Sequence, residues 1–228
     1  YYRDYAVALA HNGQAKQAQD VLKDASGYGL DDGSIHYTKG EIHAALQETD
    51  DALEEFSQCI ENTEDTYMQM RAFVMKSKIY EERQELSNNR EVLLQAKKTL
   101  PVQDQMIILE RLAQADIDLA EDTGDSSYRW EAIEILGEII DNKWAVYDDY
   151  DTLAVLYQKE GELERAASAL QTMGHLFGED YNIYKRYGFL EIQHQNALPQ
   201  EYRDYSQFLD YYNRAQKLYY EQLKKWIY

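Results

Sequence analysis

Residues 150–173 read YDTLAVLYQKEGELERAASALQTM and give the clearest indication of the fold. Its apolar residues recur at steps of three and four on both sides of Gly161, as they do along one face of an α-helix. A small residue lies near the centre of each half, Ala154 in the first and Ala166 in the second, where it lets two helices approach closely. The stretch therefore predicts two helices that meet at a turn glycine and pack against each other.

Both halves of this pattern recur along the chain. The second half, written Ala-x3-aromatic/Leu-x2-small, begins at six positions spaced 34, 37, 43, 34 and 42 residues apart: Ala18, Ala52, Asn89, Ala132, Ala166 and Phe208. The first half, Tyr150-x2-Leu153-Ala154-x2-Tyr157 in the quoted stretch, recurs around the small residues Ala6, Gly40, Ser77 and Gly188. A repeat of about 20 to 50 residues is typical of stacked helical or sheet units. Strand-like alternation is absent, so we expect helices throughout.

At these residues the chain resembles the tetratricopeptide-repeat (TPR) family, whose unit follows the pattern W-x2-L-G-x2-Y…A-x3-F…P. Pro101 falls where the closing proline of that pattern belongs. The resemblance covers essentially the whole chain and implies an all-α, right-handed α-solenoid of about six helix-turn-helix repeats, with about twelve helices. The implied single domain, residues 1–228, divides into repeats at approximately 1–32, 33–66, 67–101, 102–146, 147–180 and 181–228.

Some residues depart from the family pattern. Asn89 and Phe208 replace the small residue of the second helix. The register of the helix from about Gln103 to Glu121 stays open because two apolar faces compete, one with Ile108, Leu112, Ala115 and Leu119 and the other with Leu109, Leu112 and Ala113. A related helical solenoid with looser repeats is therefore an alternative.

Composition excludes several classes of function. The 228 residues include 23 Lys and Arg against 42 Asp and Glu, a formal charge of −19. This charge argues against nucleic acid and against anionic membrane surfaces, and it favours a basic or neutral protein or peptide as the partner. No apolar run is long enough for membrane insertion. The chain opens Tyr1-Tyr2-Arg3 without an initiator Met, which favours a fragment of a larger protein; the compartment stays open, with the cytoplasm favoured.

No residue pattern predicts catalysis, a cofactor or a metal. His36 and His43 are seven residues apart on one helical face, whereas ligands from adjacent turns need a spacing of three or four. Cys59 occupies a packing position and is expected to be a buried thiol. The carboxylates are too numerous to single out a catalytic pair. We therefore expect a protein that is not an enzyme.

Tyrosine is unusually frequent, with 21 residues, and it is dense between Tyr202 and Tyr228. One interpretation places these rings in the Leu and Phe packing positions with the hydroxyl at the rim. The other makes them a binding surface, because tyrosine anchors contacts at low entropic cost. The first interpretation is favoured.

The resemblance also implies a concave groove lined by the first helix of each repeat. The lining positions follow each family aromatic and each central small residue by one, which places Tyr37, Glu41, Lys78, Asp151, Lys185 and Phe189 in the groove. Tyr37 and Phe189 are the expected apolar anchors. The Lys and Asn clamp of the chaperone adaptors in this family is missing, because its positions hold Arg3 and Val7, or Tyr37 and Glu41.

Two functional hypotheses follow. The first is a protein–protein interaction scaffold that binds a peptide or a partner protein in its concave groove. The second is a regulatory or sensor repeat segment of a larger signalling protein, such as a bacterial Ser/Thr protein kinase.

Overall fold

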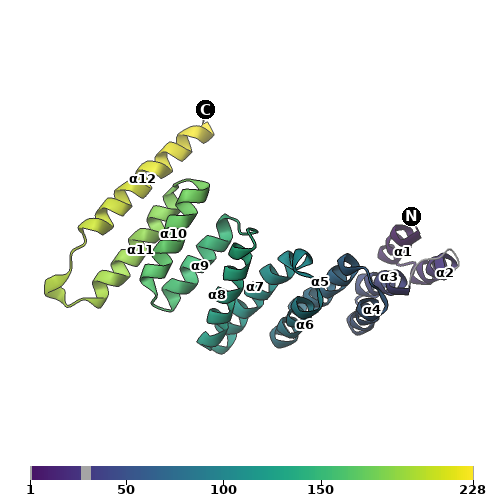
Figure 1. Ribbon diagram of the computed structural model, residues 1–228. Coiled ribbons are helices and arrows are strands. Elements are labelled where there is room, and N and C mark those ends of the chain that lie inside the picture. Colours follow the sequence, from purple (N-terminus) through teal and green to yellow (C-terminus); the bar gives the residue numbers. More distant parts are fainter. Residues whose placement is uncertain (1, 27–31, 228) are drawn as a thin grey trace. The chain divides into compact units, whose positions relative to one another are not determined.

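The structure, a computed structural model, describes residues 2–26 and 32–227, which form twelve α-helices, two short 3-10 helices and no strand (Figure 1). One compact unit reaches to Tyr128 and a second begins at Arg129. The helices of the first unit are α1 (Tyr2–His11), α2 (Ala15–Ser26), α3 (Asp32–Ala45), α4 (Thr49–Asn62), α5 (Thr66–Glu82), α6 (Leu86–Thr99), η1 (Val102–Asp104) and α7 (Met106–Thr123). Those that lie mainly in the second are α8 (Ser126–Asp141), α9 (Tyr147–Lys159), α10 (Leu163–Phe177), α11 (Tyr181–Ala197), η2 (Gln200–Tyr202) and α12 (Ser206–Ile227). The predicted all-α class with about twelve helices is confirmed, whereas the single domain and its repeat boundaries stay predictions.

Four helix pairs are joined by turns with the same backbone geometry. The turn residue has a positive φ, 75° at Gly13 and 79° at Gly161, where glycine is favoured. Gln47 and Gln84 take the same position in the second and third pairs, with φ of 62° and 58°. The next amide donates to the residue five positions back, for example Glu162 to Tyr157. That acceptor is in every case the last residue of the first-helix motif: Leu9, His43, Tyr80 and Tyr157. In these four pairs the sequence motif therefore marks the last turn of the first helix.

Small residues bring the two helices of a pair together, as the sequence predicts. Ala18, Ala52 and Ala166 have no exposed surface. At Gly40 an added Cβ would lie 2.6 Å from the Phe56 ring, so only glycine leaves room for that ring. Close approach of α3 and α4 is therefore built into the sequence at a single backbone position.

Both departures from the motif have compensating partners. Asn89 is buried, and its amide oxygen accepts a 2.7 Å hydrogen bond from Ser77, the small residue of the facing helix. Phe208 packs on Gly188, where an added Cβ would lie 3.4 Å from the ring. A larger residue on the second helix is thus matched by a polar partner or by a glycine on the first.

The helix whose register stayed open in the sequence, α7, is buried on both of the competing faces. All six apolar residues of those faces are at most 4 % exposed: Ile108, Leu109, Leu112, Ala113, Ala115 and Leu119. The apolar pattern of α7 therefore could not distinguish one face from the other, because both are in the core.

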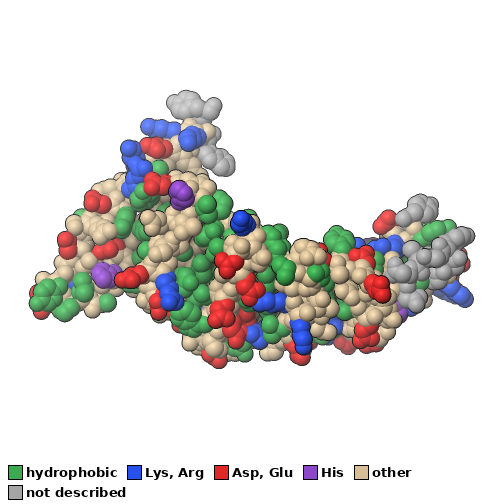
Figure 2. All heavy atoms as spheres, viewed as in Figure 1, with side chains coloured by type: hydrophobic (Ala, Val, Ile, Leu, Met, Phe, Trp, Pro, Cys, Tyr) green, Lys and Arg blue, Asp and Glu red, His purple; other side chains and the backbone are tan. Residues whose placement is uncertain are grey.

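Charge is unevenly distributed along the chain. Residues 1–180 hold 16 Lys and Arg against 37 Asp and Glu, a formal charge of −21. Residues 181–228 hold seven against five, a formal charge of +2. Figure 2 shows Lys and Arg side chains along α12. Among the described residues, no helix has the length and apolar content needed to cross a bilayer.

Candidate functional site

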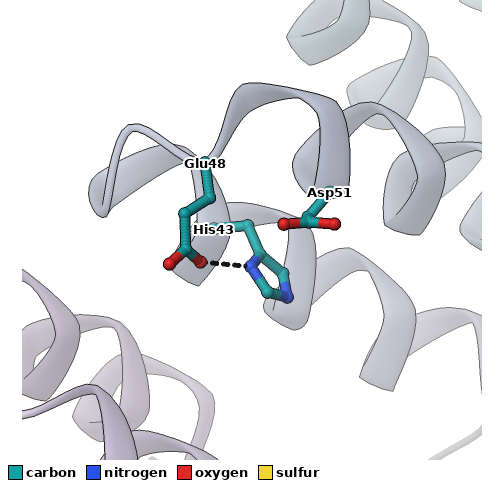
Figure 3. Close-up of side chains that lie close together, drawn as sticks. All are labelled: His43, Glu48 and Asp51. Atoms are coloured by element: carbon teal, nitrogen blue, oxygen red, sulfur yellow. Dashed lines mark hydrogen bonds and ion pairs between the residues drawn. The ribbon is translucent and has the colours of Figure 1, made fainter.

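One group of metal-binding side chains lies close together in the described part of the chain. His43, at the end of α3, and Glu48 and Asp51, at the start of α4, offer ligand atoms that all lie within 4.8 Å of one another (Figure 3). The His43 Nδ1 atom is 2.7 Å from Glu48 Oε2. Asp51 lies in the first turn of α4, where the helix dipole disfavours a cation. The imidazole–carboxylate hydrogen bond accounts for the approach of His43 and Glu48, and we assign these residues a structural role in the turn.

His36 and His43 do not form a common site. The His36 Nδ1 atom is 2.6 Å from Glu55 Oε2 on α4, so each histidine has its own carboxylate partner. Cys59 is buried in the core of the second helix pair, as its packing position predicts.

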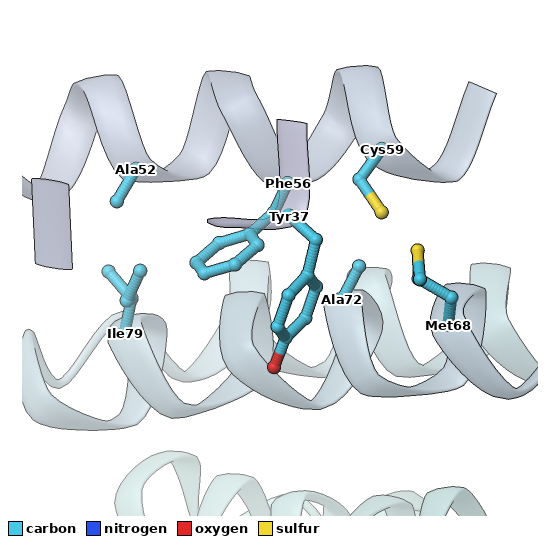
Figure 4. Packing of buried hydrophobic residues seen from close by; sticks show 7 residues of the cluster. All are labelled: Tyr37, Ala52, Phe56, Cys59, Met68, Ala72 and Ile79. Atoms are coloured by element: carbon cyan, nitrogen blue, oxygen red, sulfur yellow. The ribbon is translucent and has the colours of Figure 1, made fainter. Parts of the chain in front are cut away.

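Tyr37 is a core residue, and its expected role as an apolar anchor in the groove is corrected. Only 2 % of its surface is exposed, and its ring lies 5.5 Å from that of Phe56 among residues of α3, α4 and α5 (Figure 4). The Arg71 guanidinium of α5 lies 4.4 Å from the ring centroid. The physical reason is that a bulky aromatic side chain at this position reaches the next repeat and is buried there. Burial, together with the nearby Glu41 carboxylate, raises the pKa of the Tyr37 hydroxyl to about 12.

Glu41 and Lys78 lie on one hollow of the first unit, which we call the N-terminal hollow. Its volume is about 340 Å³, and its lining residues come from α1, α3 and α5, including Val7, His11, Glu41, Ala44, Met75 and Lys78. Three successive first helices thus share one surface. Apolar and charged side chains are mixed on it, which suits an extended segment with both kinds of residue.

Glu41 is the partly buried charge of the N-terminal hollow. Its carboxylate lies 3.6 Å from the Arg71 guanidinium. Burial raises the pKa of Glu41, while the Arg71 charge opposes the shift. Lys78 is exposed on the same surface and makes no ion pair within the described residues. The hollow therefore offers a ligand the compensated Glu41 carboxylate, the exposed Glu82 carboxylate and the available Lys78 ammonium group.

Asp151, Lys185 and Phe189 lie together on a hollow of the second unit, which we call the C-terminal hollow. Its volume is about 290 Å³, and α9 and α11 line it. Arg186 holds Asp151 through two hydrogen bonds, 2.9 Å from Nε to Oδ1 and 2.6 Å from Nη2 to Oδ2. This bidentate pair occupies the Asp151 carboxylate, so Asp151 positions α11 rather than a ligand. Phe189 is 47 % exposed, and the Lys185 ammonium lies 5.9 Å from its ring centroid.

The tyrosines of the second unit follow both of the interpretations given above. Tyr187 stacks on Tyr211 at 5.2 Å, and Tyr181 meets Tyr219 edge-on at 5.3 Å, so α11 and α12 pack through aromatic rings. Tyr212, however, is 55 % exposed. Part of the tyrosine excess therefore fills packing positions, and part forms surface.

The helix pairs recur every thirty-odd residues, have the same kind of turn between their two helices and pack through small residues. These features define a TPR-like helical-repeat fold. No protein-family model and no curated protein matches the chain. Solved structures of TPR proteins do match it. The C-terminal part of a TPR repeat-containing protein from Cytophaga hutchinsonii has a TM-score of 0.64 and 14 % identity, over 95 % of this chain and 78 % of the other.

Two further solved structures are similar to this chain. MamA from Desulfovibrio magneticus RS-1, from residue 41 to its end, has a TM-score of 0.59 and 12 % identity, over 85 % of this chain and 98 % of the other. YrrB, a TPR protein with an unusual peptide-binding site, has a TM-score of 0.55 and 12 % identity, over 86 % and 91 %. At these identities the similarity establishes the TPR-like fold of the chain.

Proposed function

We propose that this protein is a non-catalytic interaction scaffold that binds a peptide or a segment of a partner protein on the surface of its first helices. The observation that carries the proposal is the N-terminal hollow, because α1, α3 and α5 belong to different repeats and yet line one surface. The similarity to YrrB, a TPR protein with a peptide-binding site, supports a ligand of this class. The second hypothesis, a regulatory segment of a signalling protein, would use the same surface.

The ligand segment is expected to be basic or neutral. Glu41 and Glu82 both line the N-terminal hollow, and the chain as a whole has a formal charge of −19. A positively charged segment would be attracted over a long range, and its association would slow as salt increases. Apolar contacts with Val7 and Ala44, and with Phe189 in the C-terminal hollow, would supply most of the affinity.

Selection from a random-peptide library against the full chain tests the proposal. Selected peptides are labelled, and their dissociation constants are measured by fluorescence anisotropy. For peptides of the C-terminal hollow, Phe189→Ala is expected to weaken binding by about tenfold or more, because aromatic anchors contribute about 2 kcal/mol or more. For peptides of the N-terminal hollow, Lys78→Ala is expected to change the association rate.

Two matched variants serve as controls. Tyr67→Ala removes an aromatic ring that is 59 % exposed and lines neither hollow, and Lys98→Ala removes an exposed ammonium group of α6. Thermal melts of all four variants are expected to match that of the parent chain. Selected peptides that bind all four variants and the parent chain equally would refute the proposed surface.

A further inference from the structure

The second unit has an apolar groove between α11 and α12, which we call the end groove. Its volume is about 460 Å³, and its lining includes Gly188, Phe189, Ile192, Tyr212, Ala215 and Tyr219. Phe189, Tyr212 and Tyr219 are 47 %, 55 % and 43 % exposed. Monomeric proteins rarely expose large contiguous apolar patches, and an apolar patch on a folded chain usually marks an interaction site. The end groove is therefore a candidate docking surface.

The repeat motif shows which surface of the pair this is. In motif register, Tyr212 and Ala215 of α12 correspond to Phe56 and Cys59 of α4. Likewise, Lys185 of α11, which also lines the end groove, corresponds to Tyr37 of α3. In the second pair these positions form the core against the next first helix. The end groove is thus the equivalent of a surface that another helix covers elsewhere in the same chain.

The helix on that equivalent surface is α5. Figure 4 shows Met68, Ala72 and Ile79 of α5 opposite Phe56 and Tyr37. Two other first helices contact both members of the preceding pair in the same way. Helix α3 contacts α1 and α2, and α11 contacts α10 and is bound to α9 through Arg186. Within the described residues, the end groove has no such helix on it. A helix with an apolar stripe and a small central residue therefore has the shape that the groove accepts.

The charge around the end groove indicates which residues should flank the apolar stripe of the bound helix. Lys185 is the only charged residue among the described residues that line the end groove, and it makes no ion pair there. Residues 181–228 have a formal charge of +2 in a chain whose preceding residues have −21. The local charge thus differs in sign from that of the rest of the protein. We propose that the end groove binds an amphipathic, acidic α-helix of a partner protein, laid between α11 and α12 as α5 is laid on α3 and α4.

The probes are peptides with the sequence of α5, Thr66–Glu82, because its packing on the equivalent surface is known. An acidic version carries Arg71→Glu, Lys76→Glu and Lys78→Glu, and a basic version carries Glu81→Lys and Glu82→Lys. The formal charges of the two are −5 and +5, and both keep the stripe of Met68, Ala72 and Ile79. A third peptide adds Ile79→Asp to the acidic version and interrupts the stripe. Binding of each labelled peptide to the full chain is measured by fluorescence anisotropy.

The acidic peptide is expected to bind at least about tenfold more tightly than the basic and the interrupted peptides. Tyr212→Ala and Tyr219→Ala in the protein are each expected to weaken its binding by about tenfold, because exposed aromatic rings line the groove. Tyr202→Ala is the matched control, since Tyr202 is 71 % exposed and does not line the groove. Circular dichroism of each variant verifies that the helices are retained.

Three results would overturn the proposal. The first is equal binding of the acidic peptide to the Tyr212→Ala and Tyr202→Ala proteins. The second is tighter binding of the basic peptide, which would mean that the total charge of −19 outweighs the local charge. The third is self-association of the free chain in sedimentation experiments that Tyr212→Ala abolishes, which would make a second copy the occupant. Lys78→Ala, in the N-terminal hollow, is expected to leave binding of the acidic peptide unchanged, because the N-terminal hollow and the end groove share no lining residue. Failure of the end groove is thus distinguishable from failure of the N-terminal hollow, which carries the proposed function.

Discussion

Replacement of Gly40 by alanine tests the packing of a helix pair at a single atom. A Cβ at this position would lie 2.6, 2.8 and 2.9 Å from three atoms of the Phe56 ring. The ring is fully buried and packs against Tyr37, so it cannot move aside easily. Overpacking of this kind typically costs about 1–3 kcal/mol. Alanine is also favoured over glycine inside a helix by about 1 kcal/mol, and this term opposes the clash.

Gly137→Ala measures the gain in helix propensity from glycine to alanine without a clash. Gly137 lies inside α8, and an added Cβ would meet nothing within 4 Å. This variant should therefore be stabilised by about 0.5–1 kcal/mol. Gly40→Ala should be less stable than Gly137→Ala by about 1–3 kcal/mol, because the helix term is common to both. Urea unfolding followed by circular dichroism measures the two midpoints.

A double-mutant cycle identifies the clashing partner. Phe56→Leu shortens the ring side chain and should make Gly40→Ala less harmful than it is in the parent chain, so the two changes should not be additive. If Gly40→Ala stabilises the protein as much as Gly137→Ala does, or if the cycle is additive, the close approach of α3 and α4 through Gly40 is refuted.

Three further predictions concern packing, titration and turn geometry. Ala166→Leu should destabilise the fold by about 1–3 kcal/mol, because Ala166 has no exposed surface. Gln158→Leu, at the surface, should cost little. Equal melting temperatures of the two variants would contradict the repeat register. Tyr37→Phe should remove a pH-dependent part of the free energy of unfolding. The pKa of the hydroxyl is near 10 in the unfolded chain and about 12 in the folded chain. This part of the stability is therefore complete below pH 10 and is lost as the pH rises through 12. The difference in urea midpoint between parent and variant, measured from neutral pH upward, should change only above pH 10, and a constant difference would contradict the burial of this hydroxyl. Gln84→Gly should stabilise the third turn by up to about 1 kcal/mol, because Gln84 has a φ of 58°, and a lower melting temperature would show that the side chain contributes more than the strain costs.

The fold could be predicted from the sequence because its determinants are local. The positions of Ala154, Ala166 and Gly161 fix two helices, their contact and their turn within a few dozen residues, and the motif recurs often enough to be recognised. The register of α7 could not be predicted, because a helix that is buried on both sides has no polar face to orient it.

The candidate site was less predictable because it depends on contacts between repeats. The motif places Tyr37 beside the groove, but the next repeat buries the ring, and nothing near Tyr37 in the sequence indicates this. The Asp151 carboxylate likewise accepts a hydrogen bond from Arg186, 35 residues later in the sequence. The cluster of His43, Glu48 and Asp51 escaped a search for ligands on one helix, because its members lie on two helices across a turn.

The recurring turn has a consequence for how many sequences can adopt this fold. The hydrogen bonds that close the four equivalent turns join backbone atoms only, and the turn residue itself can be glycine or glutamine. The fold therefore needs particular side chains at only a few packing positions in each repeat, and most surface positions are not constrained by the turns. Identity to solved structures with this fold can then fall to 12–14 % while the backbone is retained, and no family model matches the sequence. What such chains share is the spacing of their small residues and the backbone geometry of their turns, and not the identity of most side chains.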